Sequence, residues 1–214
     1  MGRVPSVAMS AHDERRVKFR TSDDMALDGD LVVPSTCAAA AVVCHPHPQY
    51  GGDRFNPVVE AIYRALPEVG VAALRFDFRS PFDDGVGERL DALGALDLLR
   101  SAVPELPLLA AGYSFGALIA LATTADDLAG RVLVAPPLGH APAPPTTTVP
   151  TLVLTPAHDQ FASPEAVRPI VESWTDTEFV VIDMADHFIA GQTRVVADRI
   201  AEWVSDRWPL RSQP

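Results

Sequence analysis

Short apolar runs alternate with amphipathic stretches along most of the chain. The apolar runs cover residues 38–44, 71–78, 106–111, 131–135, 151–155 and 178–182. Each run is continuous and does not alternate with polar residues, which is typical of parallel strands covered on both faces. We therefore expect a mostly parallel central sheet, preceded by an antiparallel hairpin over residues 16–33 that turns near residues 21–24.

The stretches between these runs carry helical patterns. Every fourth residue is apolar over residues 58–66 and again over residues 196–204, so each stretch presents one apolar stripe. Residues 163–165 read Ser-Pro-Glu and supply an N-cap, a first-turn proline and an early acid for another helix. Strands that alternate with helices in this order predict an α/β fold, in which helices flank the central sheet.

The length of the chain favours one hydrophobic core. The chain has 214 residues, of which 48% are hydrophobic, and two independently folded cores would both have to be small. We expect a flexible N-terminal tail over residues 1–14, a single domain over residues 15–208 and a C-terminal tail over residues 209–214. Residues 136–150 are rich in proline and are expected to form a stiff surface connection inside the domain.

The charge and the cysteines exclude several classes of function. Lys and Arg number 17 against 28 Asp and Glu, and the net charge of −11 opposes contact with nucleic acid or an anionic membrane. Cys37 and Cys44 are too few for a disulfide framework and are expected to be free thiols. Residues 1–16 lack the apolar core of a secretory signal, so we expect a cytoplasmic protein.

The segment with the most specific chemistry is Gly-Tyr-Ser-Phe-Gly at residues 112–116, a Gly-x-Ser-x-Gly pattern. An apolar strand enters it and a helix-forming run, residues 117–122, leaves it, so Ser114 is expected on a sharp turn between strand and helix. Only glycine fits around a serine held in such a strained conformation. Ser114 is therefore the candidate nucleophile, and the alternative is a glycine-rich packing turn without chemistry.

A serine hydroxyl needs a base that takes its proton. His187 follows the last apolar run, on a loop before the final helical stretch, and Asp159 follows the run before it. The order Ser114, Asp159, His187 is the nucleophile-acid-base order associated with this turn. Taken singly, His187 and Asp159 are better explained as ordinary loop residues, but their joint occurrence at successive strand ends favours the catalytic interpretation. Asp186 is a rival acid, but the immediate neighbour of His187 is badly placed to reach its ring.

A third group of candidate residues follows the first apolar run. Residues 45–53 read His-Pro-His-Pro-Gln-Tyr-Gly-Gly-Asp, a tight loop whose N–H groups can stabilise the oxyanion that forms when serine attacks a carbonyl. The other donor is expected to be the N–H of Phe115, the residue after the nucleophile. A metal site on His45 and His47 is the rival interpretation, but no thiolate pair or H-E-x-x-H helix completes a ligand set. We predict neither a metal nor another cofactor.

These segments resemble those of the α/β hydrolases, and in particular a small bacterial subgroup of serine esterases. Members of that subgroup carry a His-Pro-His-Pro-x-x-Gly-Gly loop, an Arg-Phe-x-Phe-Arg strand end and a Gly-x-Ser-Phe-Gly-Ala turn. The same motifs stand here at residues 45–52, 75–79 and 112–117, and the resemblance extends over about residues 17–203. It implies an α/β-hydrolase fold with a mostly parallel sheet.

The resemblance also assigns roles to residues of this chain. It implies Ser114 as the nucleophile, His187 as the base and Asp159 as its acid partner. The second oxyanion donor is then expected to be the N–H of His47, with Gln49 and Tyr50 as alternatives.

Two loops depart from the pattern of these hydrolases. Ser80 and Pro81 lead directly into residues 82–85, where relatives usually have a glycine-containing stretch, and Ala157 stands where a glycine is common. Larger α/β hydrolases insert a lid after the sixth core strand, whereas residues 136–150 are too few for a helical cap. We therefore expect no lid domain and an open, shallow site.

The leading prediction is a serine hydrolase, a carboxylesterase or thioesterase that forms an acyl-enzyme on Ser114 from a small-molecule substrate. One alternative is an acyl-transfer, cyclisation or dehydration catalyst of a biosynthetic pathway that uses the same three residues. Another is a non-catalytic binding protein on the same fold. The expected lining suits short or medium acyl groups, or an acyl chain presented on a larger carrier, although core packing is the alternative for every aromatic member. It comprises Tyr50, Phe82, Tyr113, Phe115, His140 and Phe161.

Overall fold

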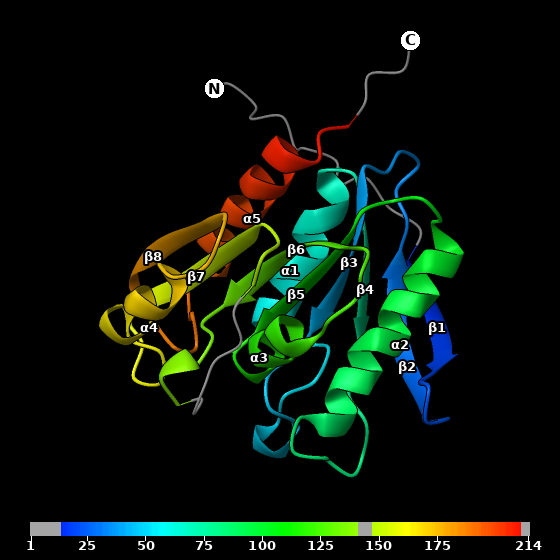
Figure 1. Ribbon diagram of the computed structural model, residues 1–214, viewed down its shortest axis with the longest axis horizontal. Helices are drawn as coiled ribbons and strands as arrows, with labels where there is room; N and C mark the ends of the chain where they lie inside the picture. The colour runs from blue at the N-terminus through cyan, green and yellow to red at the C-terminus, as the bar shows by residue number, and fades with distance from the viewer. Residues whose placement is uncertain (1–13, 141–146, 211–214) are drawn as a thin grey trace, which may run out of the picture.

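The computed structural model describes residues 14–140 and 147–210, and within them an eight-stranded sheet runs through the molecule with helices on both faces (Figure 1). The strand order is β1-β2-β4-β3-β5-β6-β7-β8. The strands are β1 Glu14–Arg20, β2 Ala26–Val32, β3 Ala39–Cys44, β4 Val71–Phe76, β5 Leu108–Tyr113, β6 Leu128–Val134, β7 Thr151–His158 and β8 Thr177–Asp186.

The sheet is parallel from β4 to β8 in its spatial order, and antiparallel only at the end that carries β1 and β2. The hairpin of β1 and β2 confirms the prediction for residues 16–33, and Thr21 and Asp24 close its turn. Each of the six predicted apolar runs falls on one strand from β3 to β8. The mostly parallel sheet flanked by helices is therefore confirmed.

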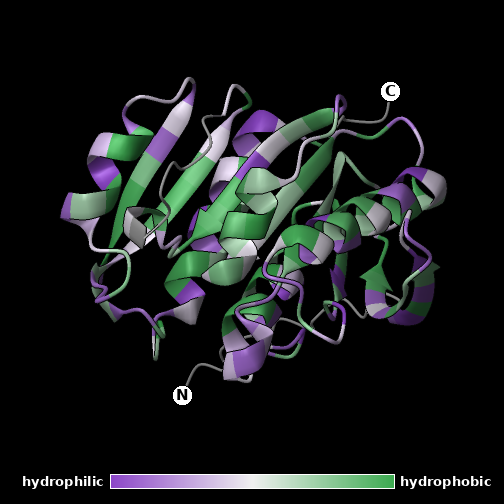
Figure 2. Ribbon diagram, turned by 60° about the horizontal axis from the view of Figure 1, so that its bottom comes forward, coloured by the Kyte–Doolittle hydropathy of each residue, from purple (hydrophilic) through white to green (hydrophobic). Residues whose placement is uncertain are grey.

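The helices divide between the two faces of the sheet. Helices α1 (Pro57–Glu68) and α5 (Thr193–Arg207) cover one face, and α2 (Val86–Ala102), α3 (Phe115–Ala122) and α4 (Pro164–Val171) cover the other. Successive residues of a strand point to opposite faces, so a strand buried on both faces must be apolar throughout. All six residues of β3 are buried in this way, and Figure 2 shows the same hydrophobic band along the central strands.

The predicted helical stripes are buried against this sheet. Val58, Ile62 and Leu66 of α1 and the corresponding residues of α5 are almost completely inaccessible to solvent. Ser163 caps α4 by accepting a hydrogen bond from the Ala166 N–H, as the sequence predicts. Helix α2 was not predicted, although its buried positions follow a helical repeat: Ala92, Ala95, Leu96 and Leu99.

The ends of the chain and the connection between β6 and β7 are described only in part. Glu14, which the predicted N-terminal tail included, is the first residue of β1, and the remainder of that tail lies outside the described residues. Residues 135–150 join β6 to β7, and their described part contains one short 3-10 turn, Leu138–His140. No helix in the described part of the chain is long and apolar enough to cross a membrane.

Candidate active site

The predicted site residues stand at the carboxyl ends of neighbouring parallel strands. Ser114 directly follows β5, Asp159 directly follows β7 and His187 directly follows β8. His45 opens the loop after β3, which pairs with β5. Because parallel strands end at the same edge of a sheet, residues that are far apart in the sequence converge there.

The turn at Ser114 is the sharp strand-to-helix turn that the sequence predicts. Ser114 has φ of 55° and ψ of −118°, a conformation that a residue with a side chain rarely adopts. Its two glycines are required by close backbone approach. A Cβ on Gly112 would lie 2.2 Å from the Gly116 carbonyl oxygen, and a Cβ on Gly116 would lie 2.3 Å from that of Cys44. The hydroxyl of Ser114 is consequently held at the N-terminal end of α3.

A continuous chain of hydrogen bonds joins the three predicted residues. The Oγ of Ser114 lies 2.9 Å from Nε2 of His187, and Nδ1 of His187 lies 2.8 Å from Oδ2 of Asp159. A carboxylate only accepts hydrogen bonds, so the proton of the neutral ring is on Nδ1 and the lone pair of Nε2 faces the serine. The structure therefore brings Ser114, Asp159 and His187 together in the predicted order.

Two backbone amides fix the carboxylate of Asp159. Its Oδ1 accepts hydrogen bonds of 2.8 Å from the N–H groups of Phe161 and Ala162, while Oδ2 is left for His187. Asp159 is 3% exposed and His187 is 6% exposed, so bulk water does not compete strongly for this pair. Asp186, the rival acid, instead accepts a hydrogen bond from the Phe188 N–H.

Tyr113 has a different place from the one predicted. Its side chain is 3% exposed, and its hydroxyl donates a 2.7 Å hydrogen bond to the backbone carbonyl of His187. Burial raises the pKa of this hydroxyl, which keeps it protonated as a donor. Tyr113 thus supports the loop that carries His187 and does not line an open surface. The prediction of Tyr113 as a substrate contact was wrong.

The loop after β3 leaves the His47 amide available. The N–H groups of Tyr50 and Gly52 donate to the His47 carbonyl, and the Gln49 N–H donates to Nδ1 of His47. Among the described residues, neither the His47 N–H nor the Phe115 N–H has an acceptor. The rings of these two residues lie 4.9 Å apart, so the loop sits beside the start of α3.

Aromatic side chains surround this arrangement. The Phe82 ring lies 4.5 Å from that of His47 and 5.5 Å from that of Phe115, so the short loop after β4 still reaches the site. Tyr50 stacks beside His47 but is 87% exposed, and Phe161 lies 4.8 Å from the ring of His187. The side chain of His140 lies outside the described part of the structure.

Two exposed apolar residues near the site, Phe188 and Met184, were not predicted from the sequence. Phe188 is 64% exposed, its ring lies 5.9 Å from that of His187, and Met184 on the same strand-loop segment is 79% exposed. Both stand close to a predicted site residue in the sequence, and large apolar side chains beside a polar loop are the signal that could have identified them.

The imidazoles of His45 and His47 do not form a pair of metal ligands. Nε2 of His45 accepts a hydrogen bond from the Phe78 N–H and Nδ1 contacts the Pro46 carbonyl oxygen, so both ring nitrogens are engaged. The ring is also buried, at 2% exposure. Within the described residues, no group of three or more His, Cys, Asp or Glu side chains could hold a metal ion.

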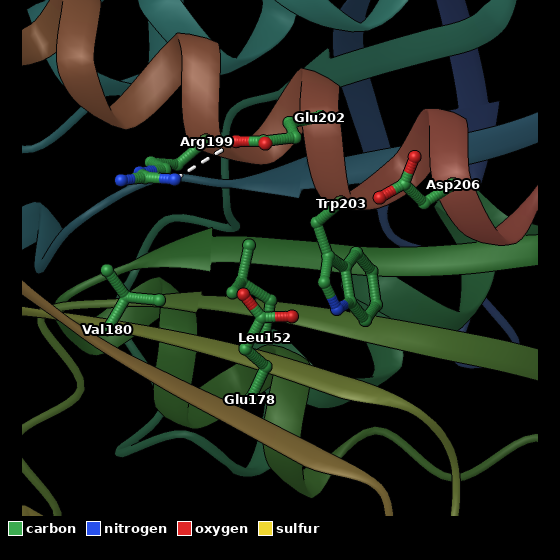
Figure 3. Close-up of a pocket in the computed structure, with 7 residues that line it drawn as sticks. All are labelled: Leu152, Glu178, Val180, Arg199, Glu202, Trp203 and Asp206. Atoms are coloured by element: carbon green, nitrogen blue, oxygen red, sulfur yellow. Dashed lines mark hydrogen bonds and ion pairs between the residues drawn. The ribbon is translucent and has the colours of Figure 1, made fainter.

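A small hollow lies at the opposite end of the strands. It has a volume of about 90 Å³ and lies between α5 and the beginnings of β7 and β8, as Figure 3 shows. Leu152 and Glu178 line it near the start of these strands, whereas Asp159 and His187 follow their ends. Its volume suits a few water molecules, and it is separate from the Ser114 site. The lining residues are Leu152, Glu178, Val180, Arg199, Glu202, Trp203 and Asp206.

Known proteins share both the sequence and the fold. The uncharacterised protein RP471 of Rickettsia prowazekii is 31% identical over 191 residues, covering 78% of this chain and 79% of its own length. A structure of an α/β serine hydrolase homologue from Coxiella burnetii is 26% identical and covers 93% of this chain and 100% of its own, with a TM-score of 0.82. The chain belongs to the family of RP471 and has the α/β-hydrolase fold. No family model matches it.

A further α/β-hydrolase structure bears on the lid. The structure of XC6422 from Xanthomonas campestris, described as an α/β serine hydrolase without a lid, is 27% identical. It covers 97% of this chain and 100% of its own, with a TM-score of 0.82. The α/β-hydrolase fold of this chain is therefore shared, over nearly its whole length, with a lid-less member.

Proposed function

We propose that this chain is a serine hydrolase that cleaves a carboxylic ester or thioester through an acyl-enzyme on Ser114. The observation that carries the proposal is the hydrogen-bonded order of Ser114, His187 and Asp159, with heavy-atom separations of 2.9 and 2.8 Å. Nucleophile, base and orienting acid lie within hydrogen-bond reach of one another, which is the geometry that acyl transfer requires.

His187 serves as the general base in the first step. As the Oγ of Ser114 attacks the substrate carbonyl carbon, Nε2 of His187 takes the hydroxyl proton, and the ring becomes an imidazolium. Asp159 stabilises that charge through Nδ1, and it holds the ring in the tautomer whose Nε2 lone pair faces the serine. When the tetrahedral intermediate collapses, the same proton passes from Nε2 to the departing alcohol or thiol.

The N–H groups of Phe115 and His47 stabilise the negative oxygen of the tetrahedral intermediate. They are supported as donors because neither has an acceptor within the described residues, whereas the amides of Gln49 and Tyr50 are used inside the loop. The first belongs to the residue after the nucleophile, and the second lies on the adjacent loop. Water then attacks the acyl-enzyme with His187 again as the base, which releases the acid and restores Ser114.

The surroundings of the site favour a small or medium acyl group. The exposed rings of Tyr50 and Phe161 and the partly exposed ring of Phe82 offer apolar contact beside Ser114. Such a rim suits an ester that approaches from solvent and rests on an open surface.

The proposal is tested by replacing Ser114 with alanine. The variant removes only an oxygen atom, so the thermal melting temperature should stay within a few degrees of the wild-type value. Hydrolysis of p-nitrophenyl acetate or butyrate should fall by several orders of magnitude, since the nucleophile is lost. Thr155→Val, which removes a buried hydroxyl from the middle of β7, is the matched control and should keep its activity. Retained hydrolysis in Ser114→Ala would remove this residue from the mechanism.

A further inference from the structure

We propose that His45 is a positioning residue, which orients the peptide bond between Pro46 and His47 so that the His47 N–H points toward the substrate oxygen. This inference deepens the proposed hydrolase function and rests on it. His45 is the first histidine of the His-Pro-His-Pro loop, and its role is indirect, because its side chain does not contact the reacting atoms.

The hydrogen bonds of His45 define a single tautomer. The backbone N–H of Phe78 lies 3.0 Å from Nε2, and a backbone amide can only donate, so Nε2 is the acceptor. The proton of the neutral ring is therefore on Nδ1, which donates to the Pro46 carbonyl oxygen at 2.6 Å. The ring is 2% exposed, so both of its polar atoms are satisfied by the protein.

The hydrogen bond from His45 to the Pro46 carbonyl also orients the proposed oxyanion donor, the His47 N–H, because both groups belong to one rigid peptide unit. The carbonyl of Pro46 and the N–H of His47 belong to the same peptide group, which is planar and trans, so the two bonds point in opposite directions. A side chain that holds this carbonyl on its buried side also fixes the direction of the N–H on the other side. That N–H has no acceptor among the described residues.

The other end of the His45 ring is anchored to the rigid part of the fold. Phe78 follows β4, and its ring lies 4.5 Å from that of His45. The next amide, of Arg79, donates to the buried carboxylate of Asp91 in α2 at 2.8 Å. His45 thus connects the loop to a segment that is itself held by a charge-assisted hydrogen bond.

Gly52 lies against the same carbonyl from another side. A Cβ on Gly52 would lie 2.1 Å from the Pro46 oxygen and 2.8 Å from the His47 oxygen, so only glycine allows the loop to return across this peptide. The first histidine and the last glycine of the motif at residues 45–52 therefore act on one peptide bond. This gives the motif a physical explanation in addition to its oxyanion donor.

The electrostatic surroundings keep the ring neutral. Burial lowers the pKa of His45, and the positive charge of Arg54 lowers it further, while Asp77, Asp53 and the Pro46 carbonyl oppose the change. A neutral ring is necessary, because protonated Nε2 could no longer accept the Phe78 N–H.

The experiment compares His45→Asn with His45→Gln. The amide of asparagine can take the place of Nδ1 and donate to the Pro46 carbonyl, whereas glutamine reaches the place of Nε2 and leaves that carbonyl unheld. In ester hydrolysis we expect His45→Asn to keep kcat within about tenfold of wild type. For His45→Gln we expect kcat to fall about 100-fold while KM changes little, as when an oxyanion contact is lost.

Leu66→Ala, a cavity variant in α1, controls for lost stability, since its melting temperature should fall while kcat stays the same. Equal losses in the Asn and Gln variants, or a loss confined to KM, would overturn the role of His45 and leave the hydrolase intact. A wild-type protein that neither hydrolyses esters nor reacts with a fluorophosphonate would overturn the proposed function and this role with it. The nitrogen chemical shifts of the His45 ring test its tautomer separately from activity. A proton on Nε2 would contradict the proposed geometry whether or not the protein hydrolyses esters.

Discussion

The Oγ of Ser114 lies 2.9 Å from Nε2 of His187, although 73 positions separate the two residues in the sequence. The sheet creates this contact, because β5 and β8 end at the same edge. Ser114 directly follows the last residue of β5, and His187 directly follows the last residue of β8. The pair is completed by Asp159, which directs the lone pair of the ring toward the serine.

Replacing Asp159 with asparagine should lower kcat by about 10³-fold to 10⁴-fold, because the amide no longer holds His187 in the required tautomer. Asp186→Asn is the matched control, since Asp186 adjoins His187 in the sequence but its carboxylate accepts a hydrogen bond from the Phe188 N–H. Its kcat should stay within a few-fold of wild type. Comparable losses in the two variants would show that Asp159 is not the specific partner of His187.

The second oxyanion donor can be removed without removing the loop. His47 has φ of −55°, which is compatible with proline, so His47→Pro deletes the N–H at a permitted backbone angle. His47→Ala loses the same ring but keeps the N–H. We expect kcat of His47→Pro to be about 10²-fold to 10³-fold below that of His47→Ala, measured with p-nitrophenyl esters after melting curves show that both fold. Equal kcat values would exclude the His47 amide as a donor.

Stability should decrease in mild acid because His45 is buried in its neutral form. Burial lowers the pKa of His45 from its ordinary value of 6.5, so the unfolded chain binds a proton at a pH where the native protein does not. The contribution of His45 to the free energy of unfolding is therefore complete above about pH 6.5 and is lost as the pH falls toward the lowered native pKa. Between about pH 7.5 and pH 5.5, the free energy of unfolding measured in urea should decrease less for His45→Asn than for wild type. The same change in both proteins would contradict this assignment.

The ion pair of Arg79 and Asp91 should matter more for stability than a surface pair in the same helix. The carboxyl side chain of Asp91 is 0% exposed, and Arg79 is its buried partner. Asp91→Asn leaves that guanidinium without its buried charge partner and should lower the free energy of unfolding by about 3 kcal/mol. Asp97→Asn, which breaks an exposed pair with Arg100, should change it by less than about 1 kcal/mol. Denaturant unfolding of both variants checks this difference, and equal effects would refute it.

Negative charge around the site should discriminate between substrates. Asp84 and Glu88 act electrostatically on His47, and Asp186 acts on Tyr113, the residue before Ser114, so negative charge acts on residues of the site. An ester that carries a carboxylate should therefore have a lower kcat/KM than a neutral ester of the same chain length. Its kcat/KM should rise as sodium chloride approaches about 1 M, whereas that of the neutral ester should change little. A salt response shared by both esters would exclude this explanation.

Local patterns in the sequence were sufficient to predict most of the fold. Six continuous apolar runs mark the parallel strands, and their order predicts Ser114, Asp159 and His187 at strand ends, where the structure has them. The burial of Tyr113 also follows from the sequence pattern. Leu109, Ala111 and Tyr113 alternate along β5 and point to the face covered by α1 and α5, so Tyr113 is buried there.

Other features depend on contacts that a single segment does not contain. The tautomer of His45 follows from the Phe78 N–H, which is 33 positions away. The free amide of His47 is identified only because the amides of the alternative donors, Gln49 and Tyr50, have acceptors within the loop. Helix α2 was missed because its buried positions include the glycines Gly87 and Gly94 and the acids Glu88 and Asp91, which interrupt the apolar stripe. Those acids bind Gly85 and Arg79, and neither partner is predictable from helical periodicity.

The most direct test of the central claim is covalent labelling of the purified protein with an alkyl fluorophosphonate, followed by intact-mass and peptide mass spectrometry. We predict one phosphonyl group per chain, located on Ser114. Ser114→Ala should not be labelled, and His187→Ala should be labelled much more slowly, since the base that activates the hydroxyl is gone. A protein that stays unlabelled, or one that is labelled at another residue, would contradict the assignment of Ser114 as the nucleophile.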